Sequence, residues 1–366
     1  MYESRIAAGP VTVAAGAGLA PEIDALAACN LARHGFLRAA WYGADSRSDA
    51  RTLLVRRHGT GALLAALPTV PFGPAIAGAR KVPGPYWPLR AALVAPDCDS
   101  LELAEAFSHR AADALGSVWR LGPARIDDPA LENLVAAARL AGWSVLSRPA
   151  GTSWTIDCDA ARASGWPRQS TAKRMARIER RLAGQGVVAW QYVRGPDWND
   201  GVLAELGEVE AASWIATKTD GGGAKFMTTR QRAQWRDAAA DQVLAGMLCA
   251  TILRVEGRAV AFSFDLDDGP VRYGIAGTYR TDFGKYEVGK LANYRSVADA
   301  IRAGQQVVDL GAGDSGYKRE MGAVPGYDFA DVLFVRSRTA ARLLERVWGP
   351  AMPTTPQMPL QVQAHA

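Results

Sequence analysis

Residues 270–290 read PVRYGIAGTYRTDFGKYEVGK, and this stretch decides how the rest of the sequence is interpreted. Its first ten residues, 270–279, have the β-branched and aromatic composition of a strand. A loop at 284–289 follows, with glycines at both ends and Lys285 between them. The pattern then becomes helical from about 288 to 303. A strand, a glycine-containing loop and a helix in this order predict a loop whose backbone amides lie at a helix N-terminus.

The segments around this stretch predict a complete α/β unit. Two strands at 248–255 and 258–266 precede it, separated by turns at Glu256-Gly257 and 267–269, so the three strands form a meander. Further upstream the pattern predicts a strand at 187–193 and helices at 201–214 and 229–246. Downstream come a buried strand at 306–310, a glycine-rich segment at 311–322 and a last strand at 331–336.

The first half of the chain shows a similar alternation of helices and strands, which is typical of α/β folds. The predicted elements are a strand at 11–15, a helix at 20–38, a hairpin at 51–57 and 62–67, helices at 101–115 and 129–141, and strands at 117–121 and 143–148. Residues 81–88, KVPGPYWP, are too rich in proline and glycine for regular structure and predict a loop with two exposed aromatic residues.

Length and composition favour two folded domains. The chain has 366 residues, of which 49% are apolar and 22% are charged, as in ordinary globular proteins. The boundaries that we predict are an N-terminal domain at 1–160, a basic linker helix at 161–186, a C-terminal domain at 187–350 and a disordered tail at 351–366. The tail is rich in proline, glutamine and threonine.

The remaining composition excludes several classes of protein. The four cysteines lack paired spacing, so we expect neither disulfides nor a zinc site. No metal-ligand spacing appears, and no histidine lies in a nucleophile-elbow motif, so a triad hydrolase has little support. No window is apolar enough to span a membrane and no export signal is apparent. We therefore expect a cytoplasmic protein, with peripheral attachment to the inner membrane as a further hypothesis.

Three stretches together resemble the CelD/BcsL-type acyltransferases, a branch of the GNAT superfamily related to the Fem peptidyl transferases. They are EAASW at 210–214, GTYRTDFGKYEVGK at 277–290 and DLGAGDSGYKREMG at 309–322. The basic helix with Lys173, Arg174, Arg177 and Arg180 matches the Arg-rich segment of that family. The resemblance covers about residues 50–340. The sequence departs from the family at Ile215, where lysine is frequent, and at 287–288, where Ser-Pro is common.

The resemblance implies an α/β fold of two tandem GNAT-like domains, each with a mixed, mostly antiparallel sheet flanked by helices. It also implies an acyl-thioester site in the C-terminal half. There the strand at 272–278 would splay from its neighbour and pair with the pantetheine arm of coenzyme A. The residues expected to bind coenzyme A are Lys285, Tyr286, Gly289 and Lys290. The alternative is an ordinary solvated turn with two lysines.

Acylation of an amine requires a group that takes a proton and donors that stabilise negative charge. Glu210 is the first candidate for the base, and it could equally be one of several surface acids on its helix. Tyr279 could donate to the leaving thiolate or be a core tyrosine. By resemblance to the Fem relatives, Lys318 would stabilise charge on the donor and Asp314 would orient it or hold the amine. The residues expected to bind substrate are Trp214, Asp309 and Tyr317, the last two in a glycine-rich segment that could instead be a mononucleotide loop.

The basic helix at 168–184 has one apolar stripe, Met175, Ile178 and Leu182, which we expect to face the protein. It is either a solvated helix that bridges the domains or a surface that attracts an anionic membrane through Arg174, Arg177 and Arg181. Nucleic acid is not expected as a partner.

We predict direct transfer of an acyl group from coenzyme A, or from a carrier-protein thioester, to a primary amine, without a covalent enzyme intermediate and without a metal. The favoured acceptor is a sphingoid base, because a related bacterial group acts as ceramide synthases and because the apolar, aromatic-bearing loop at 82–87, the basic helix and the absence of a membrane span suit a lipid amine. An amino sugar of an exopolysaccharide is the alternative. Two hypotheses from other classes remain: a Fem-like transferase that uses aminoacyl-tRNA, and a non-catalytic scaffold.

Overall fold

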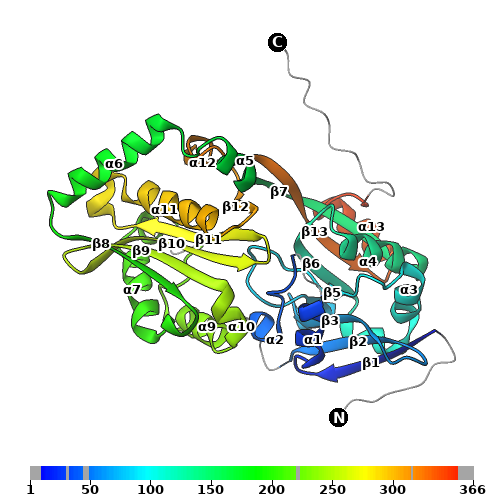
Figure 1. Ribbon diagram of the computed structural model, residues 1–366. Helices are drawn as coiled ribbons and strands as arrows, with labels where there is room; N and C mark the ends of the chain where they lie inside the picture. The colour runs from blue at the N-terminus through cyan, green and yellow to red at the C-terminus, as the bar shows by residue number, and fades with distance from the viewer. Residues whose placement is uncertain (1–9, 30–32, 44–48, 220–222, 315, 353–366) are drawn as a thin grey trace.

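The computed structural model describes residues 10–29, 33–43, 49–219, 223–314 and 316–352 (Figure 1). It contains one mixed sheet whose strands follow the order β1-β2-β3-β4-β6-β13-β7-β12-β11-β10-β9-β8, with β5 paired to β3 beside this path. The strands are β1 (Val11–Ala17), β2 (Arg51–Arg57), β3 (Leu63–Pro71), β4 (Ala79–Lys81), β5 (Leu93–Val94), β6 (Val118–Arg125), β7 (Ser144–Asp157), β8 (Val188–Arg194), β9 (Leu248–Val255), β10 (Arg258–Asp268), β11 (Val271–Tyr279), β12 (Val307–Ala312) and β13 (Val324–Val335).

Helices cover both faces of the sheet. They are α1 (Glu22–Cys29), α2 (Ala39–Gly43), α3 (Ser100–Ser108), α4 (Pro129–Leu140), α5 (Cys158–Ala163), α6 (Gln169–Ala183), α7 (Asp200–Ala211), α8 (Trp214–Lys218), α9 (Thr229–Ala239), α10 (Gln242–Met247), α11 (Val288–Arg302), α12 (Tyr317–Glu320) and α13 (Arg338–Val347). Short 3-10 helices are η1 (Ala75–Ala77), η2 (Arg110–Leu115), η3 (Gly195–Asp197) and η4 (Thr281–Tyr286). In the C-terminal half, α6 and α11 lie on one face, and α7, α9 and α10 lie on the other (Figure 1).

Each half of the sheet is an antiparallel run that ends in one short parallel pair. In the N-terminal half, β1 to β4 are antiparallel neighbours and β4 pairs with β6 in parallel. In the C-terminal half, β8 to β11 are antiparallel neighbours and β11 pairs with β12 in parallel. The same pattern in both halves confirms the predicted α/β fold of two tandem GNAT-like units.

The last strand requires a correction to the predicted arrangement. The sequence order placed the strand at 331–336 at the end of the C-terminal unit. In the structure β13 lies between β6 and β7, which are both in the first half of the chain. The long strand β7 then pairs with β12 of the C-terminal half. The C-terminal segment therefore contributes a strand to the N-terminal half, and β7 and β13 tie the halves into one sheet.

Most predicted elements are present with shifted ends. The helix predicted at 20–38 is shorter and is followed by the separate helix α2, the one at 201–214 continues as α8, and the one at 229–246 divides into α9 and α10. The helix α13 was not predicted. A disordered tail was predicted at 351–366. Within it, Met352 donates its backbone N–H to the Val145 oxygen at 2.9 Å. Residues 353–366 lie outside the described residues.

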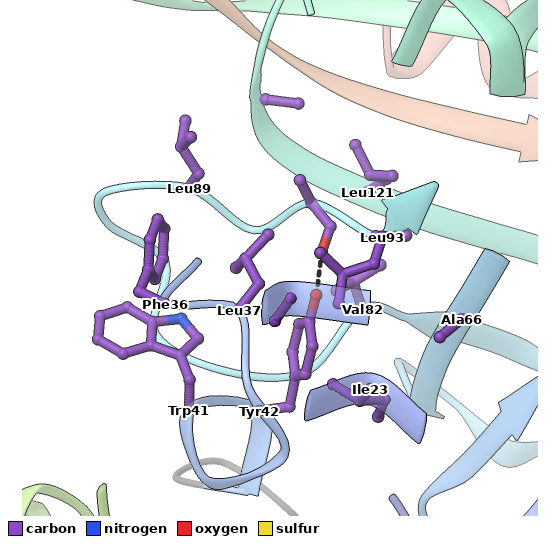
Figure 2. Packing of buried hydrophobic residues seen from close by; sticks show 14 of the residues in the cluster. Ile23, Phe36, Leu37, Trp41, Tyr42, Ala66, Val82, Leu89, Leu93 and Leu121 are labelled. Atoms are coloured by element: carbon purple, nitrogen blue, oxygen red, sulfur yellow. Dashed lines mark hydrogen bonds between the residues drawn. The ribbon is translucent and has the colours of Figure 1, made fainter. Parts of the chain in front are cut away.

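The largest hydrophobic cluster extends across both halves. Figure 2 shows part of it, where Phe36, Leu37, Trp41 and Tyr42 pack together with residues of the N-terminal half. The Tyr42 hydroxyl donates to the Ala91 oxygen at 2.7 Å, which satisfies the polar end of a fully buried ring. Continuous apolar contact across the junction resists separation of the two halves.

Aromatic pairs mark where this cluster crosses from one half to the other. The ring centroids of Trp41 and Trp235 are 5.8 Å apart, and those of Phe36 and Tyr273 are 6.1 Å apart. In both pairs the first ring belongs to the N-terminal half and the second to the C-terminal half.

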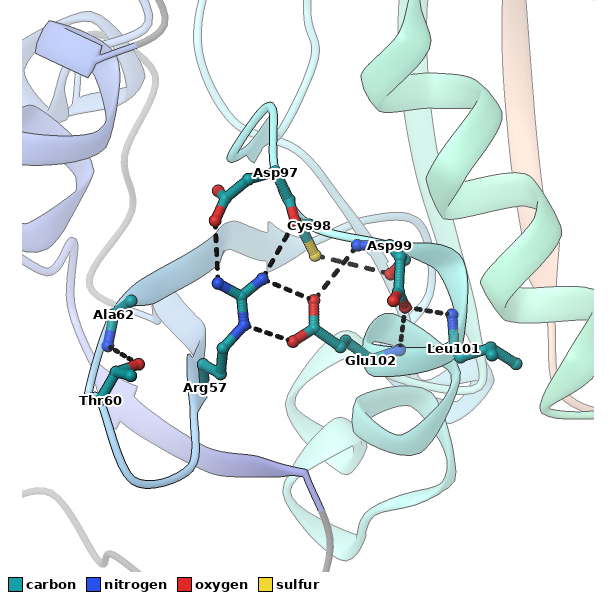
Figure 3. A network of polar contacts seen from close by, with 8 residues as sticks. All are labelled: Arg57, Thr60, Ala62, Asp97, Cys98, Asp99, Leu101 and Glu102. Atoms are coloured by element: carbon teal, nitrogen blue, oxygen red, sulfur yellow. Dashed lines mark hydrogen bonds and ion pairs between the residues drawn. The ribbon is translucent and has the colours of Figure 1, made fainter.

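A polar network fastens the first hairpin to α3 (Figure 3). Arg57 at the end of β2 contacts both oxygens of Glu102 at 2.6 and 3.0 Å, and it reaches Asp97 at 2.8 Å. Glu102 also closes a capping box with Asp99 at the start of α3. The network therefore sets the position of α3 on the sheet and is structural.

The buried carboxylate of Asp268 at the end of β10 is expected to make stability depend on pH. Its Oδ2 accepts the backbone N–H of Gly35 at 3.2 Å, and the side chain is 1% exposed. Burial raises the pKa of Asp268 from the usual 3.8 to about 6. The native state therefore binds this proton more tightly than the unfolded state. The contribution of Asp268 to the free energy of unfolding is therefore fully present below about pH 4. As the pH rises through about 6, the free energy of unfolding falls by roughly 3 kcal/mol.

We expect Asp268→Asn to raise the free energy of unfolding at about pH 8 by up to roughly 3 kcal/mol, because the asparagine carries no charge to desolvate. Urea unfolding at about pH 8 and pH 5 measures this gain, which should shrink at the lower pH. The matched control is Asp237→Asn, whose side chain is 73% exposed. A less stable Asp268→Asn variant at pH 8 would contradict the prediction.

Candidate functional site

The sheet opens between β11 and β12. The two strands pair in parallel over three positions only, Val271–Tyr273 opposite Val307–Asp309, and then diverge. At the same place the register between β10 and β11 shifts, so Ile275 is an extra residue in β11. The predicted splay of the strand at 272–278 is therefore present and begins at Gly274.

The corresponding opening in the N-terminal half is closed by its own backbone. There β4 and β6 also pair over three positions, Ala79–Lys81 opposite Val118–Arg120. Beyond them, Val82 donates to the Arg120 oxygen, and Arg90 exchanges backbone hydrogen bonds with Gly122 and Pro123. Of the two splays, the one in the C-terminal half is therefore the one that retains space for a ligand.

A pocket of about 150 Å³ occupies the α11 side of this splay. Its floor is β11, where Gly274, Ala276 and Gly277 leave room because they are small. A Cβ on Gly277 would lie 3.0 Å from the Asn293 Oδ1 atom, so the glycine allows α11 to approach closely. The lining residues are Ser263, Asp265, Gly274, Ile275, Ala276, Gly277, Asn293, Ser296, Val297, Leu310 and Tyr317.

Asp265 is the carboxylate among the residues that line this pocket, and it lies in none of the motifs quoted from the sequence. Its Oδ1 accepts the Ser263 hydroxyl at 3.0 Å and its Oδ2 accepts the Ser296 hydroxyl at 2.8 Å. Burial raises the pKa of Asp265 to about 6, opposed by Arg272 and the two serine hydroxyls. A carboxylate with this pKa at the start of the splay can accept a proton near neutral pH.

Trp87 of the N-terminal half closes the opposite side of the splay. Its Nε1 donates to the Gly274 oxygen at 2.8 Å, and its ring packs edge-on against Phe329 with centroids 4.9 Å apart. The loop at 81–88 was predicted to expose two aromatic residues. Tyr86 is 43% exposed, but Trp87 is half-buried and bound to the C-terminal half. This corrects the prediction for Trp87, because the carbonyl freed by the splay gives its indole a partner.

The N-terminus of α11 faces the basic helix α6. Glu287, at the start of α11, has a positive φ of 53°. It pairs with Arg174 of α6 and, at 3.3 Å, with Lys290. Glu320 contacts the same two cations, Arg174 at 3.2 Å and Lys290 at 2.9 Å. The network anchors α6 beside the loop that was predicted to hold the pyrophosphate of coenzyme A.

The four residues predicted to bind coenzyme A lie together in η4 and the first turn of α11. Lys290 belongs to the network just described, whereas the Lys285 ammonium lies 5.1 Å from the centre of the Tyr286 ring. Tyr286 is buried and packs against α6. Gly289 lies under the ring of Tyr279, because a Cβ there would be 2.5 Å from Tyr279 Cδ1. Their role in binding remains a prediction.

The glycine-rich loop after β12 is folded around the ammonium of Lys318. Its Nζ donates to the oxygens of Gly311, Ala312 and Gly313 at 2.8, 3.0 and 2.8 Å. Asp309 is fully buried and accepts from Ser153 and Tyr327 and from the Gly311 N–H at 2.8 Å. The three N–H bonds of the Lys318 ammonium are therefore all used by backbone carbonyls. The sequence had predicted that this ammonium would stabilise negative charge on the acyl-CoA. The geometry supports a structural role for Lys318 instead.

The other residues predicted in this loop separate into two groups. Tyr317 lines the pocket across from β11, and its role in binding substrate remains a prediction. Asp314 accepts the Gly316 N–H at 3.0 Å and pairs with Arg319 at 2.5 Å, so it shapes the loop. Asp309 lies behind the loop and does not line the pocket.

Glu210 and Trp214 lie away from this pocket. The Glu210 carboxylate is fully buried and accepts the backbone N–H groups of Lys225 at 2.9 Å and Phe226 at 2.6 Å. Burial raises its pKa, and these backbone donors oppose the shift. Trp214 is 41% exposed at the start of α8. Because Glu210 is occupied in holding the loop before α9, its geometry argues against the predicted role as the general base.

The apolar stripe of α6 is buried as predicted, since Met175, Ile178 and Leu182 are each at most 4% exposed. Arg177 and Arg181 are exposed, while Arg174 forms ion pairs with Glu287 and Glu320. Attraction of this helix to an anionic membrane stays a prediction.

No helix among the described residues is both long and apolar enough to cross a bilayer. Within the same residues, no group of three or more His, Cys, Asp and Glu side chains could hold a metal ion.

The comparison with protein families agrees with this geometry. Residues 169–319 match the family described as Acetyltransferase (GNAT) domain. The matched region contains α6, the meander, the splay, α11 and the Lys318 loop. A search of curated proteins finds no match to this sequence.

Solved structures share the fold of this chain over most of its length. FemX is similar with a TM-score of 0.57 and 11% identity, over 88% of this chain and 98% of FemX. L-PGS from Bacillus licheniformis is similar with a TM-score of 0.54 and 14% identity, over 91% of this chain and 98% of the other. At these identities the likeness is one of fold. The region that matches the acetyltransferase family therefore lies in the C-terminal half of a two-unit fold.

Proposed function

We propose that this protein transfers an acyl group from a coenzyme A thioester to a primary amine at the splay between β11 and β12. The observation that carries the proposal is the opening of the parallel pair after three positions, with a pocket on its α11 side. An extended pantetheine arm pairs with backbone groups of a strand in the way that an added strand does. The α11 N-terminus, with Lys285 beside it, suits the pyrophosphate.

The groups that acyl transfer requires are a base, donors for the oxyanion and a donor for the leaving thiolate, and all have candidates at the splay. Asp265 would take the proton from the attacking ammonium, so that the free amine attacks the thioester carbonyl. The N–H groups of β11 at the splay would stabilise the oxyanion. The C–S bond then breaks and the thiolate takes a proton from Tyr317 or Tyr279, the candidate donors. The second proton of the acylated nitrogen replaces the one that the tyrosine gives up. Of the four cysteines, none lines the pocket, which favours direct transfer over a covalent enzyme intermediate.

The acceptor remains open between a sphingoid base and a polar amine such as an amino sugar. The sphingoid base was favoured partly because the loop at 82–87 was expected to be exposed and apolar. Trp87 of that loop instead donates a hydrogen bond to Gly274 and packs against Phe329. This observation removes one reason for a lipid acceptor and favours the polar amine. Turnover of a sphingoid base with a long-chain acyl-CoA by the purified protein would reverse that preference.

Thermal unfolding in the presence of coenzyme A, acetyl-CoA and palmitoyl-CoA tests the donor site. A ligand that binds only the folded protein at about 100 times its Kd adds about 2.7 kcal/mol of stability. We expect a rise in Tm with the thioesters. A larger rise with palmitoyl-CoA would indicate a lipid acyl chain, and equal rises would indicate a short one.

The variant Gly289→Ala is expected to reduce this stabilisation, because the added Cβ would displace the Tyr279 ring at the N-terminus of α11. The matched control is Gly246→Ala in α10, where an added Cβ meets nothing within 4 Å. Unaltered Tm shifts in Gly289→Ala would contradict a binding site at this loop. Absence of any shift in the wild-type protein would instead favour a transferase that uses aminoacyl-tRNA, which ribonuclease-sensitive activity would reveal, or a non-catalytic scaffold.

A further inference from the structure

A second pocket, of about 210 Å³, lies at the junction of the two halves. It lies on the side of the sheet that carries α9. Its N-terminal wall is the loop around Tyr86 with Arg90, and its C-terminal wall is Lys225 with the first turns of α9. The lining residues are Gly84, Pro85, Tyr86, Arg90, Ala224, Lys225, Gln231, Gln234 and Trp235. Neither the predicted site residues nor the coenzyme A site accounts for it.

The pocket is adjacent to the acyl-transfer site. Tyr86 lines this pocket, and the next residue, Trp87, donates to Gly274 at the splay. Consecutive Cα atoms are about 3.8 Å apart, so one loop borders both cavities. The alternation of β10 separates them by face: Phe262 and Phe264 pack toward Phe226 and α9, while Ser263 and Asp265 line the coenzyme A side.

Two cations from different halves of the chain converge on this pocket. Arg90 is 8% exposed, donates to the Gly84 oxygen at 3.0 Å and lies 5.5 Å from the centre of the Tyr86 ring. Lys225 faces it from the loop before α9. Burial lowers the pKa of Lys225, Glu210 opposes this shift, and the charge of Arg90 adds to it. The Glu210 carboxylate already accepts the backbone N–H groups of Lys225 and Phe226.

The surroundings of Tyr86 are also basic. Arg120 of β6 and Arg148 of β7 share the single carboxylate of Asp331, at 2.6 and 3.0 Å. All three charged groups act electrostatically on Tyr86, so one acid between two guanidinium groups leaves a net positive charge beside this wall of the pocket. A concave site with convergent cations, amide side chains and an aromatic wall is suited to an anionic group on a small polar molecule.

We propose that this pocket binds a carboxylate or phosphate group of the acyl acceptor, so that the acceptor is an acidic amine. The anion lies between Arg90 and Lys225, the Gln234 amide of α9 donates to it, and the amine extends along the Tyr86–Trp87 loop toward the splay. This inference rests on the proposed acyl transfer and names its acceptor class. It predicts that an amine with an acidic group is preferred over the same amine without one.

Competitive labelling of lysines with an amine-reactive reagent, read by peptide mass spectrometry, tests the site without any need for turnover. The probes are inorganic phosphate, succinate and coenzyme A at constant ionic strength. We expect phosphate or succinate to slow the labelling of Lys225 by about threefold or more, because a bound anion shields the amine and favours its charged form. The exposed Lys218 on α8 is the control and should not change.

The two oxyanion probes also distinguish the two ligand classes. Protection by phosphate alone would indicate a phosphorylated acceptor, and protection by succinate alone an amino acid or other carboxylate. Equal slowing of Lys218 and Lys225, or no slowing of Lys225 by either anion, would overturn the proposal. Coenzyme A reports separately on Lys285. Protection of Lys285 by coenzyme A, together with no slowing of Lys225 by phosphate or succinate, leaves the acyltransferase standing and removes the acidic acceptor. No protection of Lys285 would remove the donor site itself.

Turnover with matched amines extends the test. We expect glucosamine 6-phosphate to exceed glucosamine, or an amino acid to exceed its decarboxylated amine, by about tenfold or more in kcat/KM, the equivalent of one charge-assisted contact. Lys225→Met should bring that ratio close to one, whereas Lys218→Met should leave it as in the wild type. A ratio that Lys225→Met does not alter would contradict the assignment of this pocket.

Discussion

Asp265→Asn is expected to lower kcat for acyl transfer by about 100- to 1,000-fold, the effect of removing a general base. The asparagine is nearly the same size and can still accept a hydroxyl hydrogen bond from Ser263 or Ser296 through its oxygen. It cannot accept a proton. We therefore expect the variant to fold, to bind coenzyme A and to lose the chemical step.

The pH profile identifies the group more specifically. Burial raises the pKa of Asp265 to about 6, and the base is active when deprotonated, so kcat should rise as the pH rises through about 6. This limb should be absent in the residual activity of Asp265→Asn. The control is Asp282→Asn, whose side chain is 54% exposed in η4 and which should retain both the rate and the limb. Wild-type kcat in Asp265→Asn would remove Asp265 from the mechanism.

Glu210→Gln provides the complementary comparison, since Glu210 was the base predicted from sequence. Its carboxylate accepts the backbone N–H groups of Lys225 and Phe226 and does not line the pocket at the splay, so the substitution should leave kcat for acyl transfer close to the wild-type value. The pH limb near 6 should remain. Loss of that limb in a folded Glu210→Gln protein would restore the original assignment.

The sequence predicted the elements of the C-terminal half well because their signals are local. Turns at Glu256-Gly257 and Gly269 separate three strands, and the glycine-containing loop leads into α11. The position of β13 was not predictable in this way. Its partners, β6 and β7, lie about 200 residues earlier in the chain, and no local pattern specifies which strands will pair over such a distance.

The candidate site was predicted only in part, for the same reason. Tyr317 and the loop at 284–289 are marked by motifs and lie where expected. Asp265 had a weaker signal, the alternation of Ser263 and Asp265 with Phe262 and Phe264 in β10. Alternation predicts a polar face, but it does not say whether that face meets water or a pocket under α11. Trp87 had no signal at all, because its partner, Gly274, is 187 residues away.

Lys318→Met is expected to lower the free energy of unfolding by about 3 kcal/mol or more, because it leaves buried polar groups without their partner. The ammonium holds the oxygens of Gly311, Ala312 and Gly313 and offsets the buried charge of Asp309. Methionine fills similar space but donates no hydrogen bond. The loop should loosen, and Tyr317 at the pocket wall should lose its position, so activity should fall with stability.

Urea unfolding compares this variant with Arg319→Met, its neighbour in α12. The Arg319 side chain is 66% exposed and pairs with Asp314, so its removal should cost less than about 1 kcal/mol. A Lys318→Met protein that unfolds like the wild type, binds coenzyme A and yet does not transfer the acyl group would require the lysine to act on the donor directly. That result would mean that the three carbonyls release the ammonium when the thioester binds, and it would restore the role predicted from sequence.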